Sequence, residues 1–254
     1  MLDPQFCLQL ARSEADVAAA QRLRYKVFVS ELGGDGAAVD HEAEREADTF
    51  DAFNDHLVLR DMARPETDRV IGVYRLMRED QARRAGRFYS EAEYDLDALR
   101  RGGRRLLELG RSCVHPDYRG GTAMYHLWSG LAEYVARHGI DLIFGVGSFH
   151  GTDLQRLAAP LSALHHRHLA PVHLRATVRP TQGVAMDILP VDGFDRVAAM
   201  RAVPALIKGY LRLGGHVGQG AFVDRAFNTT DVFLVVDTAH RNARRSTIYD
   251  GARA

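Results

Sequence analysis

The pattern of apolar and polar positions predicts alternating strands and helices along most of the chain. Alternating or continuous apolar runs predict strands at residues 6–11, 56–60, 70–77, 106–114, 141–149, 184–189 and 231–237. Helical spacing of apolar residues predicts helices at residues 13–32, 122–138, 152–168 and 202–213. No repeat or low-complexity linker interrupts this order, so we expect one α/β domain over residues 1–238 and a basic, flexible tail at 239–254.

Four charged residues lie in stretches whose other positions predict burial. They are Arg24 on the first helix, Arg75 on strand 70–77, and Glu108 and Arg111 on strand 106–114. Because an unpaired buried charge is strongly destabilising, each should have a partner. The polar stretch that follows the first helix supplies candidate carboxylates at Glu44, Glu46, Asp48 and Asp51. A structural ion-pair network and a substrate site both account for this pattern.

Composition narrows the class of protein. The 33 basic and 33 acidic residues give a formal net charge of zero, which argues against a nucleic-acid partner. Only two cysteines occur, so a disulfide scaffold is not expected and a reducing compartment is favoured. No signal peptide is visible, and the longest stretches without charge, 142–152 and 213–223, are shorter than the about 20 residues that span a bilayer. We therefore expect a cytoplasmic protein.

The segment from Val114 to Gly121 joins a predicted strand to a predicted helix through a glycine-containing turn. Such a turn exposes backbone N–H groups at the start of the helix, and these groups bind anions together with the helix dipole. An ordinary strand-to-helix turn is the alternative interpretation. The string Val-x-Pro-x-Tyr-Arg-Gly, however, resembles the phosphopantetheine-binding turn of the GNAT-type N-acyltransferases.

Longer strings resemble the L-ornithine Nα-acyltransferases of bacterial ornithine-lipid synthesis, which are GNAT-fold relatives of the acyl-homoserine-lactone synthases. The matching strings lie at residues 21–28, 108–119, 148–152, 207–214 and 227–232. The resemblance covers roughly residues 6–238, and its C-terminal strings are the most specific. The lactone synthases usually carry a tryptophan shortly after the first helix, where this chain has Gly33 and Gly34, so the resemblance to them is weaker.

The resemblance implies a GNAT-like fold with a central mixed, mostly antiparallel sheet flanked by helices and an elaborated C-terminal third. It implies transfer of a 3-hydroxyacyl chain from acyl carrier protein to the α-amine of L-ornithine, forming lyso-ornithine lipid. The donor is the 3-hydroxyacyl-phosphopantetheine arm of the carrier, and no cofactor is bound permanently. Peripheral contact with the inner membrane surface is a further expectation. The alternatives are a lactone synthase, an acyltransferase for another amino acid, and a non-catalytic protein that binds carrier protein or lipid.

The expected chemistry assigns roles to particular residues. Attack of an amine on a thioester needs a base and donors for the oxyanion. Glu108 and His150 are the candidate catalytic groups, although a salt-bridged Glu108 would be a scaffold and His150 also fits a structural hydrogen-bonding role at a strand end. The resemblance places thioester-facing and phosphopantetheine-facing groups at Ser112, Cys113, Val114, Arg119, Gly120 and Gly121. Candidate substrate contacts are Arg24, Phe28, Asp48, Asp51, Arg75, Arg111 and Ser148.

Two further clusters of basic residues stand out in the sequence. The histidines at 165, 166, 168 and 173 share their spacing with no carboxylate or cysteine, so a solvated helix end is favoured over a metal site. The arginine-rich stretch 83–105 is a candidate docking surface for the acidic acyl carrier protein. Because 31 of the 33 basic residues are arginines and only Lys26 and Lys208 are lysines, clusters of arginine carry less weight in this chain.

Overall fold

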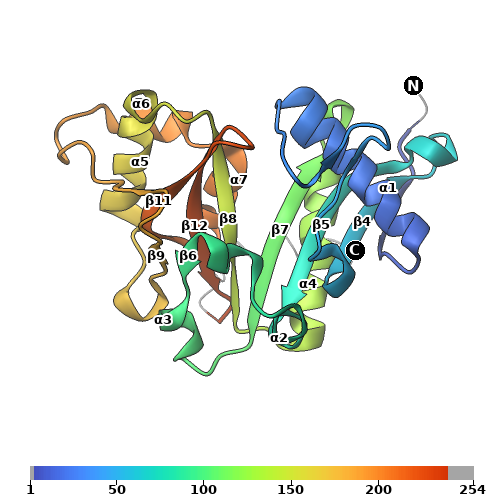
Figure 1. Cartoon of the computed structure of the whole chain (residues 1–254), viewed down its shortest axis with the longest axis horizontal. Helices are drawn as coiled ribbons and strands as arrows, with labels where there is room; N and C mark the ends of the chain where they lie inside the picture. Colours follow the sequence, from blue (N-terminus) through green and yellow to red (C-terminus); the bar gives the residue numbers. More distant parts are fainter. Residues whose placement is uncertain (1–2, 240–254) are drawn as a thin grey trace. The chain divides into compact units, whose positions relative to one another are not determined.

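The computed structural model describes residues 3–239, which form two compact units (Figure 1). Unit 1 comprises residues 3–86 and 108–139, and unit 2 comprises residues 87–107 and 140–239. The single domain expected over residues 1–238 stays a prediction. The expected tail lies outside the described residues apart from Ala239.

Unit 1 is built on four neighbouring strands in the order β1-β4-β5-β7. Their bounds are Phe6–Leu10 for β1, Asp55–Asp61 for β4, Val70–Arg78 for β5 and Leu106–Val114 for β7. The pairs β1/β4 and β4/β5 are antiparallel, so the strands predicted at 56–60 and 70–77 form a hairpin. The polar stretch that follows the first helix contains a two-stranded sheet of β2 (Val39–Asp40) and β3 (Arg45–Glu46).

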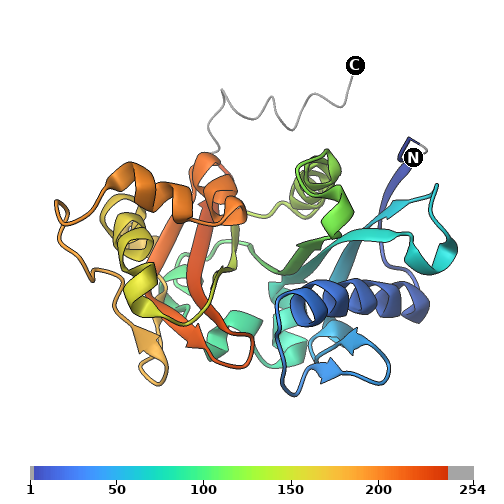
Figure 2. The ribbon, with the colours of Figure 1, turned by 90° about the horizontal axis from the view of Figure 1, so that it is seen from above.

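Two helices cover opposite faces of these strands (Figure 2). Helix α1 (Glu14–Arg24) continues as a π-helical segment, Tyr25–Glu31, and α4 spans Ala123–His138. Successive side chains of a strand point to opposite faces of the sheet, so neighbouring residues pack against different helices. Val73 packs under α1, whereas a Cβ added to Gly72 would lie 2.9 Å from Leu127 of α4. Glycine at position 72 therefore lets α4 approach the sheet closely.

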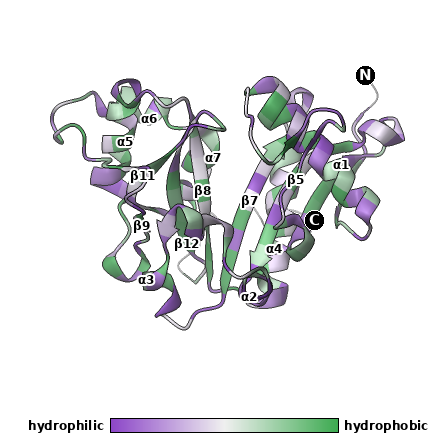
Figure 3. Cartoon of the chain, in the orientation of Figure 1, coloured by the Kyte–Doolittle hydropathy of each residue, from purple (hydrophilic) through white to green (hydrophobic). Residues whose placement is uncertain are grey.

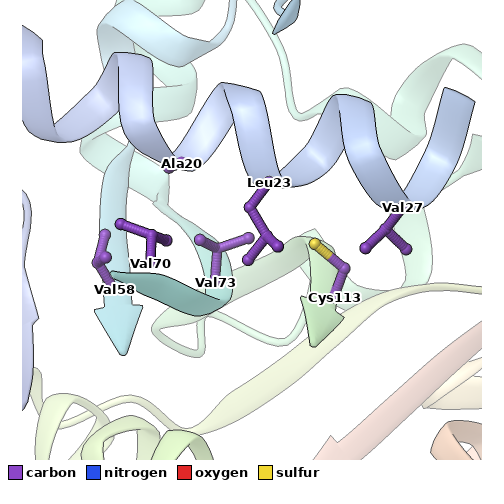
Figure 4. Close-up of a cluster of buried hydrophobic side chains, with 7 residues drawn as sticks. All are labelled: Ala20, Leu23, Val27, Val58, Val70, Val73 and Cys113. Carbon is purple, nitrogen blue, oxygen red and sulfur yellow. The ribbon is translucent and has the colours of Figure 1, made fainter. Parts of the chain in front are cut away.

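The apolar face of α1 forms a compact core with the sheet (Figure 4). Ser13 caps the helix, because its side chain accepts a hydrogen bond from the Asp16 N–H at 3.2 Å. Leu23 lies over Val73, and the Cys113 sulfur points up toward Leu23 and Val27 on the helix. The helix is thereby fixed over β5 and β7.

Unit 2 contains the strand order β8-β12-β11-β9-β6, with β10 paired to β11. The bounds are Leu142–His150 for β8, Thr229–Asp237 for β12, His216–Asp224 for β11, Thr177–Val178 for β9, Tyr94–Asp95 for β6 and Gly183–Val184 for β10. Helices α5 (Leu154–His168), α6 (Arg196–Ala202) and α7 (Ala205–Arg212) belong to this unit. On one face Phe88 packs edge-on against Phe144, and on the other Ile207 of α7 packs beside Gly147.

The expected fold class is confirmed, because both units are mixed α/β and their strand pairs are mostly antiparallel. The arginine-rich stretch carries α2 (Glu79–Ala85) and α3 (Asp97–Arg100). Two predictions were wrong. The strand expected at 184–189 is reduced to β10, and the helix expected from 202 begins at Ala205, because Pro204 caps it. Strand β11 was missed, since Gly218 and Gly220 break its apolar pattern.

Among residues 3–239, no helix is long and apolar enough to cross a membrane. In Figure 3 the strands are mainly green, with purple bands on β5 and β7 that mark hydrophilic residues within the sheet of unit 1.

Replacing Leu23 with Ala should lower the free energy of unfolding by about 2–5 kcal/mol, because it leaves a cavity between α1 and the sheet. Urea denaturation measures the loss. The neighbouring exposed Arg22→Ala is the control and should change stability by less than about 0.5 kcal/mol. Equal effects of the two variants would contradict the packing described for α1.

Candidate active site

Six charged side chains in unit 1 form a closed ring of ion pairs, which we call the charge ring. Its members are Arg24, Arg75, Arg111, Glu46, Asp48 and Asp51. Each guanidinium group binds two carboxylates, and each carboxylate binds two guanidinium groups. The three positive and three negative charges balance within the ring.

The ring joins four parts of unit 1. Arg24 ends α1, Arg75 lies on β5 and Arg111 on β7, while the three carboxylates come from the segment that starts at β3. The N···O distances are 2.7 Å for Arg24–Asp51, 2.9 Å for Arg75–Asp51, 2.6 Å for Arg75–Asp48, 3.1 Å for Arg111–Asp48 and 3.0 Å for Arg111–Glu46, and Arg24 also binds Glu46. Arg24 is 1% exposed and Glu46 is fully buried, so these pairs are little screened by solvent.

Asp51 makes the most contacts in the ring. Its carboxylate also accepts a hydrogen bond from Gln21 Nε2 at 2.9 Å. Burial alone would raise the pKa of Asp51, but the charges and hydrogen bonds of Arg24 and Arg75 outweigh it and hold the pKa well below its usual range. The pKa of Asp48 is lowered against burial in the same way by Arg75 and Arg111.

His56 holds the backbone at Asp51. Its Nε2 lies 3.0 Å from the Asp51 carbonyl oxygen, to which only a protonated nitrogen can donate. Burial, helped by the nearby charges of Arg24 and Arg75, lowers the pKa of His56. The imidazole is therefore neutral near pH 7 and carries its proton on Nε2.

The backbone of β7 is left-handed at one residue of the charge ring. Arg111 has φ +50°, which side chains other than glycine rarely adopt and which costs about 1–3 kcal/mol. Its ion pairs to Glu46 and Asp48 hold the guanidinium while the strand departs from extended geometry. The left-handed residue immediately precedes Ser112–Val114, where the resemblance places thioester-facing groups.

Glu108 lies on β7, three residues before Arg111, and is 4% exposed. Sequence reasoning allowed Arg24, Arg75 or Arg111 to neutralise it. Each of these guanidinium groups is already shared between two carboxylates of the charge ring. Glu108 is not a member of the charge ring as defined above, and it lies on the same strand as Arg111.

The three residues after Arg111 differ in their surroundings. The Ser112 hydroxyl is buried and has no hydrogen-bond partner among the described residues. The Cys113 thiol belongs to the core under α1, and burial raises its pKa to about 12, so it is no nucleophile near neutral pH. Val114 is buried, and its carbonyl accepts a hydrogen bond from Arg119 Nε at 3.2 Å.

The turn between β7 and α4 exposes its two glycines and its arginine, and the arginine is paired. Arg119 forms a two-pronged ion pair with Glu31, with Nη2 2.6 Å from Oε2. Gly120 has φ +77°, and a Cβ added there would meet no heavy atom within 4 Å. Thr122, which precedes α4, makes no capping hydrogen bond through its side chain. The turn thus offers an open approach to the start of α4.

The candidate residues of unit 2 lie on β8. Ser148 and His150 are exposed and share one face of the strand. Their partners across the sheet are Asp231 and Thr229 of β12, so the strings 148–152 and 227–232 meet in register. Asn228 adopts φ +51° in the turn before β12, which explains the asparagine as a turn residue.

Other candidates have structural surroundings. Phe28 is partly buried and packs against the core under α1. Three arginines of the stretch 83–105 bind carboxylates within unit 2, namely Arg100 to Glu91, Arg104 to Asp237 and Arg105 to Asp141. Within the described part of the chain, no three His, Cys, Asp or Glu side chains are grouped so that they could hold a metal ion.

Sequence reasoning did not assign several residues that shape this site. Glu46 was only one of four candidate partners, and His56, Gln21 and His115 were given no role. The signal for Glu46 was its place in an acidic segment between two elements with buried arginines. Nothing in the local pattern distinguishes the other three.

Comparison with known proteins shows which family the chain belongs to. A Rhodobacter capsulatus protein named L-ornithine N(alpha)-acyltransferase is 57% identical over 244 residues, which cover 95% of this chain and 93% of that protein. A Brucella abortus protein of the same name is 43% identical over 251 residues, which cover 97% and 89%. The chain belongs to the L-ornithine Nα-acyltransferase family. Residues 23–129 also match the acetyltransferase (GNAT) domain family.

Solved structures agree on the fold. The structure of FeeM, an N-acyl amino acid synthase from uncultured soil microbes, has a TM-score of 0.53 at 10% identity and covers 93% of each chain. The CoA-dependent acyl-homoserine lactone synthase BjaI has a TM-score of 0.51 at 15% identity, over 94% of this chain and 82% of that chain. These likenesses concern the fold, and the GNAT assignment comes from the domain match over residues 23–129.

Replacing Glu46 with Gln should lower the free energy of unfolding by about 3–5 kcal/mol, because it breaks two buried ion pairs and leaves the charge ring positive. Urea denaturation at pH 7 measures the change. Glu42→Gln on the same segment is exposed and serves as the control. A Glu46→Gln variant as stable as this control would show that the ring does not hold the fold.

Stability should fall as the pH drops below about 6.5, since the unfolded chain then binds a proton at His56 that the folded protein excludes. One such group contributes up to about 1.4 kcal/mol per pH unit. His56→Gln keeps an N–H donor for Asp51 and should make the pH dependence between 7.5 and 5.5 shallower. Exposed His41→Gln is the control, and unchanged slopes in both variants would exclude this role of His56.

Asp48 and Asp51 add stability that is present above about pH 4 and is lost as the pH falls through their lowered pKa values.

Proposed function

We propose that this chain transfers a 3-hydroxyacyl group from acyl carrier protein to the α-amine of L-ornithine. The products are lyso-ornithine lipid and the free thiol of the carrier. The observation that carries the acceptor assignment is the 57% identity, over nearly the whole chain, to a protein named L-ornithine N(alpha)-acyltransferase. The donor assignment rests on the resemblance of the 108–119 string and on the accessible turn before α4.

In the proposed step the amine nitrogen attacks the thioester carbonyl carbon. The carbon–nitrogen bond forms, the carbon–sulfur bond breaks, and the carrier leaves as a thiolate that takes up a proton. An α-amine with a pKa near 8 is mostly protonated at pH 7, so a base assists the attack. We assign the base role to Glu108 and the oxyanion donors to backbone N–H groups of Ser112–Val114.

The position of Glu108 supports it as the base. Glu108 is 4% exposed and lies on β7, on the same strand as Ser112–Val114, to which we assign the oxyanion donors. His150, exposed at the end of β8, is the second candidate.

The charge ring supports a positioning role for its own members. Arg24, Asp48, Asp51, Arg75 and Arg111 bind one another, and direct contact of these residues with ornithine stays a prediction. Phe28 and Ser148 stay predicted substrate contacts as well. Carrier docking on the stretch 83–105 is less supported than the sequence suggested, since Arg100, Arg104 and Arg105 are paired internally.

The proposed location is the cytoplasm, where acyl carrier protein is available. Peripheral membrane contact through the apolar face of α7 has little support, because Ile207 and Tyr210 are buried within unit 2.

The reaction is tested by incubating the purified protein with 3-hydroxyacyl carrier protein, an equimolar amino-acid mixture and S-adenosylmethionine, with products read by mass spectrometry. A dominant acyl-ornithine mass is expected. Another acylated amine would overturn the acceptor, and bound carrier without product would favour a non-catalytic protein.

Glu108→Gln should reduce turnover by about 100-fold or more and leave carrier binding unchanged, because the amide cannot accept the amine proton. Steady-state kinetics and a carrier-binding titration measure the two effects. Glu133→Gln, exposed on α4, is the control and should be fully active. Full activity of Glu108→Gln would remove it from the mechanism.

A further inference from the structure

The turn between β7 and α4 is anchored to a distant part of unit 1 by the side chain of Tyr118. Residues 116–122 are all exposed except Tyr118, which is partly buried. Its hydroxyl donates a hydrogen bond to Oδ2 of Asp61 at 2.5 Å and lies 3.5 Å from Nη1 of Arg64. Asp61 is the last residue of β4, and Arg64 lies in the connection between β4 and β5. Tyr118 therefore ties the turn to the hairpin of β4 and β5.

Asp61 joins three segments of unit 1 through one carboxylate. Its side chain is buried, with 3% of the residue exposed. Oδ1 accepts hydrogen bonds from the backbone N–H groups of Gln5 at 2.9 Å and Ala63 at 3.0 Å, while Oδ2 accepts from Tyr118. Burial alone would raise the pKa of Asp61, but these hydrogen bonds hold it below its usual range. The acceptor is therefore a charged carboxylate near neutral pH.

The phenol of Tyr118 is suited to donate this hydrogen bond. Burial and the hydrogen bond to Asp61 raise its pKa, so it keeps its proton near neutral pH. Its ring packs edge-on against Phe6 and His115, with centroids 6.1 Å and 5.9 Å apart, and Arg64 lies 5.6 Å above it. Ring packing is not directional, whereas a charge-assisted hydrogen bond fixes the hydroxyl in one place.

Other links to the turn are at more exposed positions. Arg119 pairs with Glu31 at side-chain exposures of 43% and 34%, and Asp117, whose side chain is 65% exposed, lies 3.5 Å from Arg64. Such ion pairs are screened by solvent and stabilise weakly. The two glycines at 120 and 121 add no side-chain restraint. The hydrogen bond from Tyr118 to Asp61 is therefore the strongest restraint on the middle of the turn.

We propose that Asp61, acting through the Tyr118 hydroxyl, positions the turn between β7 and α4 for the acyl donor. A glycine-containing turn that is ordered before binding loses less conformational entropy when the donor arrives. This inference rests on the proposed function, which assigns the donor to this turn. Asp61 and Tyr118 are thus positioning residues, and the proposal requires no contact between them and the donor.

The substitution Tyr118→Phe isolates the hydrogen bond, because it removes the hydroxyl and keeps the ring. Steady-state kinetics with varied 3-hydroxyacyl carrier protein should show a donor KM raised about 3- to 30-fold, since only molecules with an ordered turn bind the donor. The kcat and the KM for L-ornithine should stay unchanged. Tyr25→Phe is the matched control, because it removes another phenolic hydroxyl of unit 1, which lies 3.1 Å from Nδ1 of His41, and it should leave the donor KM unchanged.

Asp61→Asn tests whether Asp61 acts through Tyr118. It should raise the donor KM by itself and have little further effect in the Tyr118→Phe background, because both substitutions remove the same interaction. Additive effects on the donor KM would overturn the proposed route through Tyr118. If Asp61→Asn does not fold, the Tyr118→Phe kinetics decide the proposal.

Two kinetic results for Tyr118→Phe would overturn the proposal. An unchanged donor KM would show that the hydrogen bond does not position the turn. A lower kcat with an unchanged donor KM would indicate a loss of folded protein or a part in the chemical step, and neither is a positioning role.

Hydrogen exchange separates this inference from the proposed reaction, because it needs no substrate. Tyr118→Phe should speed exchange of the backbone amides within residues 115–122 and leave the exchange of β8 in unit 2 unchanged. Faster exchange in a protein that forms no acyl-ornithine would refute the proposed reaction and support the restraint on the turn. Unchanged exchange in a protein that forms acyl-ornithine would refute the restraint alone.

Discussion

The fold of unit 1 around its candidate chemistry depends on the closure of the charge ring. Each member faces two opposite charges, so no single ion pair can be removed without leaving a buried charge poorly compensated. Arginine suits this arrangement, since its planar fork bridges two carboxylates at once. The ring ties the segment that starts at β3 to α1, β5 and β7, and it fixes Arg111 in a left-handed conformation within β7. The direction of β7 beyond Arg111 is therefore set by electrostatics as well as by strand pairing.

Most of the framework follows from local patterns. Strands β4, β5 and β7 and helices α1 and α4 were predicted within a few residues, since each has a clear period and recognisable ends. Strand β11 could not be predicted in this way. A Cβ at position 218 would lie 2.8 Å from the Ala176 carbonyl oxygen, so this close contact with a distant part of the chain requires glycine there. The same glycine weakens the local strand pattern in the sequence.

The candidate site shows the same division between local and distant information. The sequence identified Arg24, Arg75, Glu108 and Arg111 as charges on apolar elements, and the structure buries them all or nearly so. Sequence reasoning could not decide between ion pairing and substrate binding, because a guanidinium suits both. Whether these arginines pair with carboxylates of the chain depends on how residues 46–51 fold back onto the sheet. The expected acceptor and donor came from the family resemblance, which no count of charges could replace.

The pairing of charges separates two kinds of residue in unit 1. The arginines of the charge ring and Arg119 are bound to carboxylates of the chain, and they hold the backbone where the ring and the turn need it. Glu108 lies outside the ring, 4% exposed, on the strand that Arg111 anchors. An amine must lose a proton as it attacks a thioester, and in the proposed reaction Glu108 takes up that proton. The ring therefore acts on the proposed chemistry indirectly, because it holds β7, from which Glu108 projects.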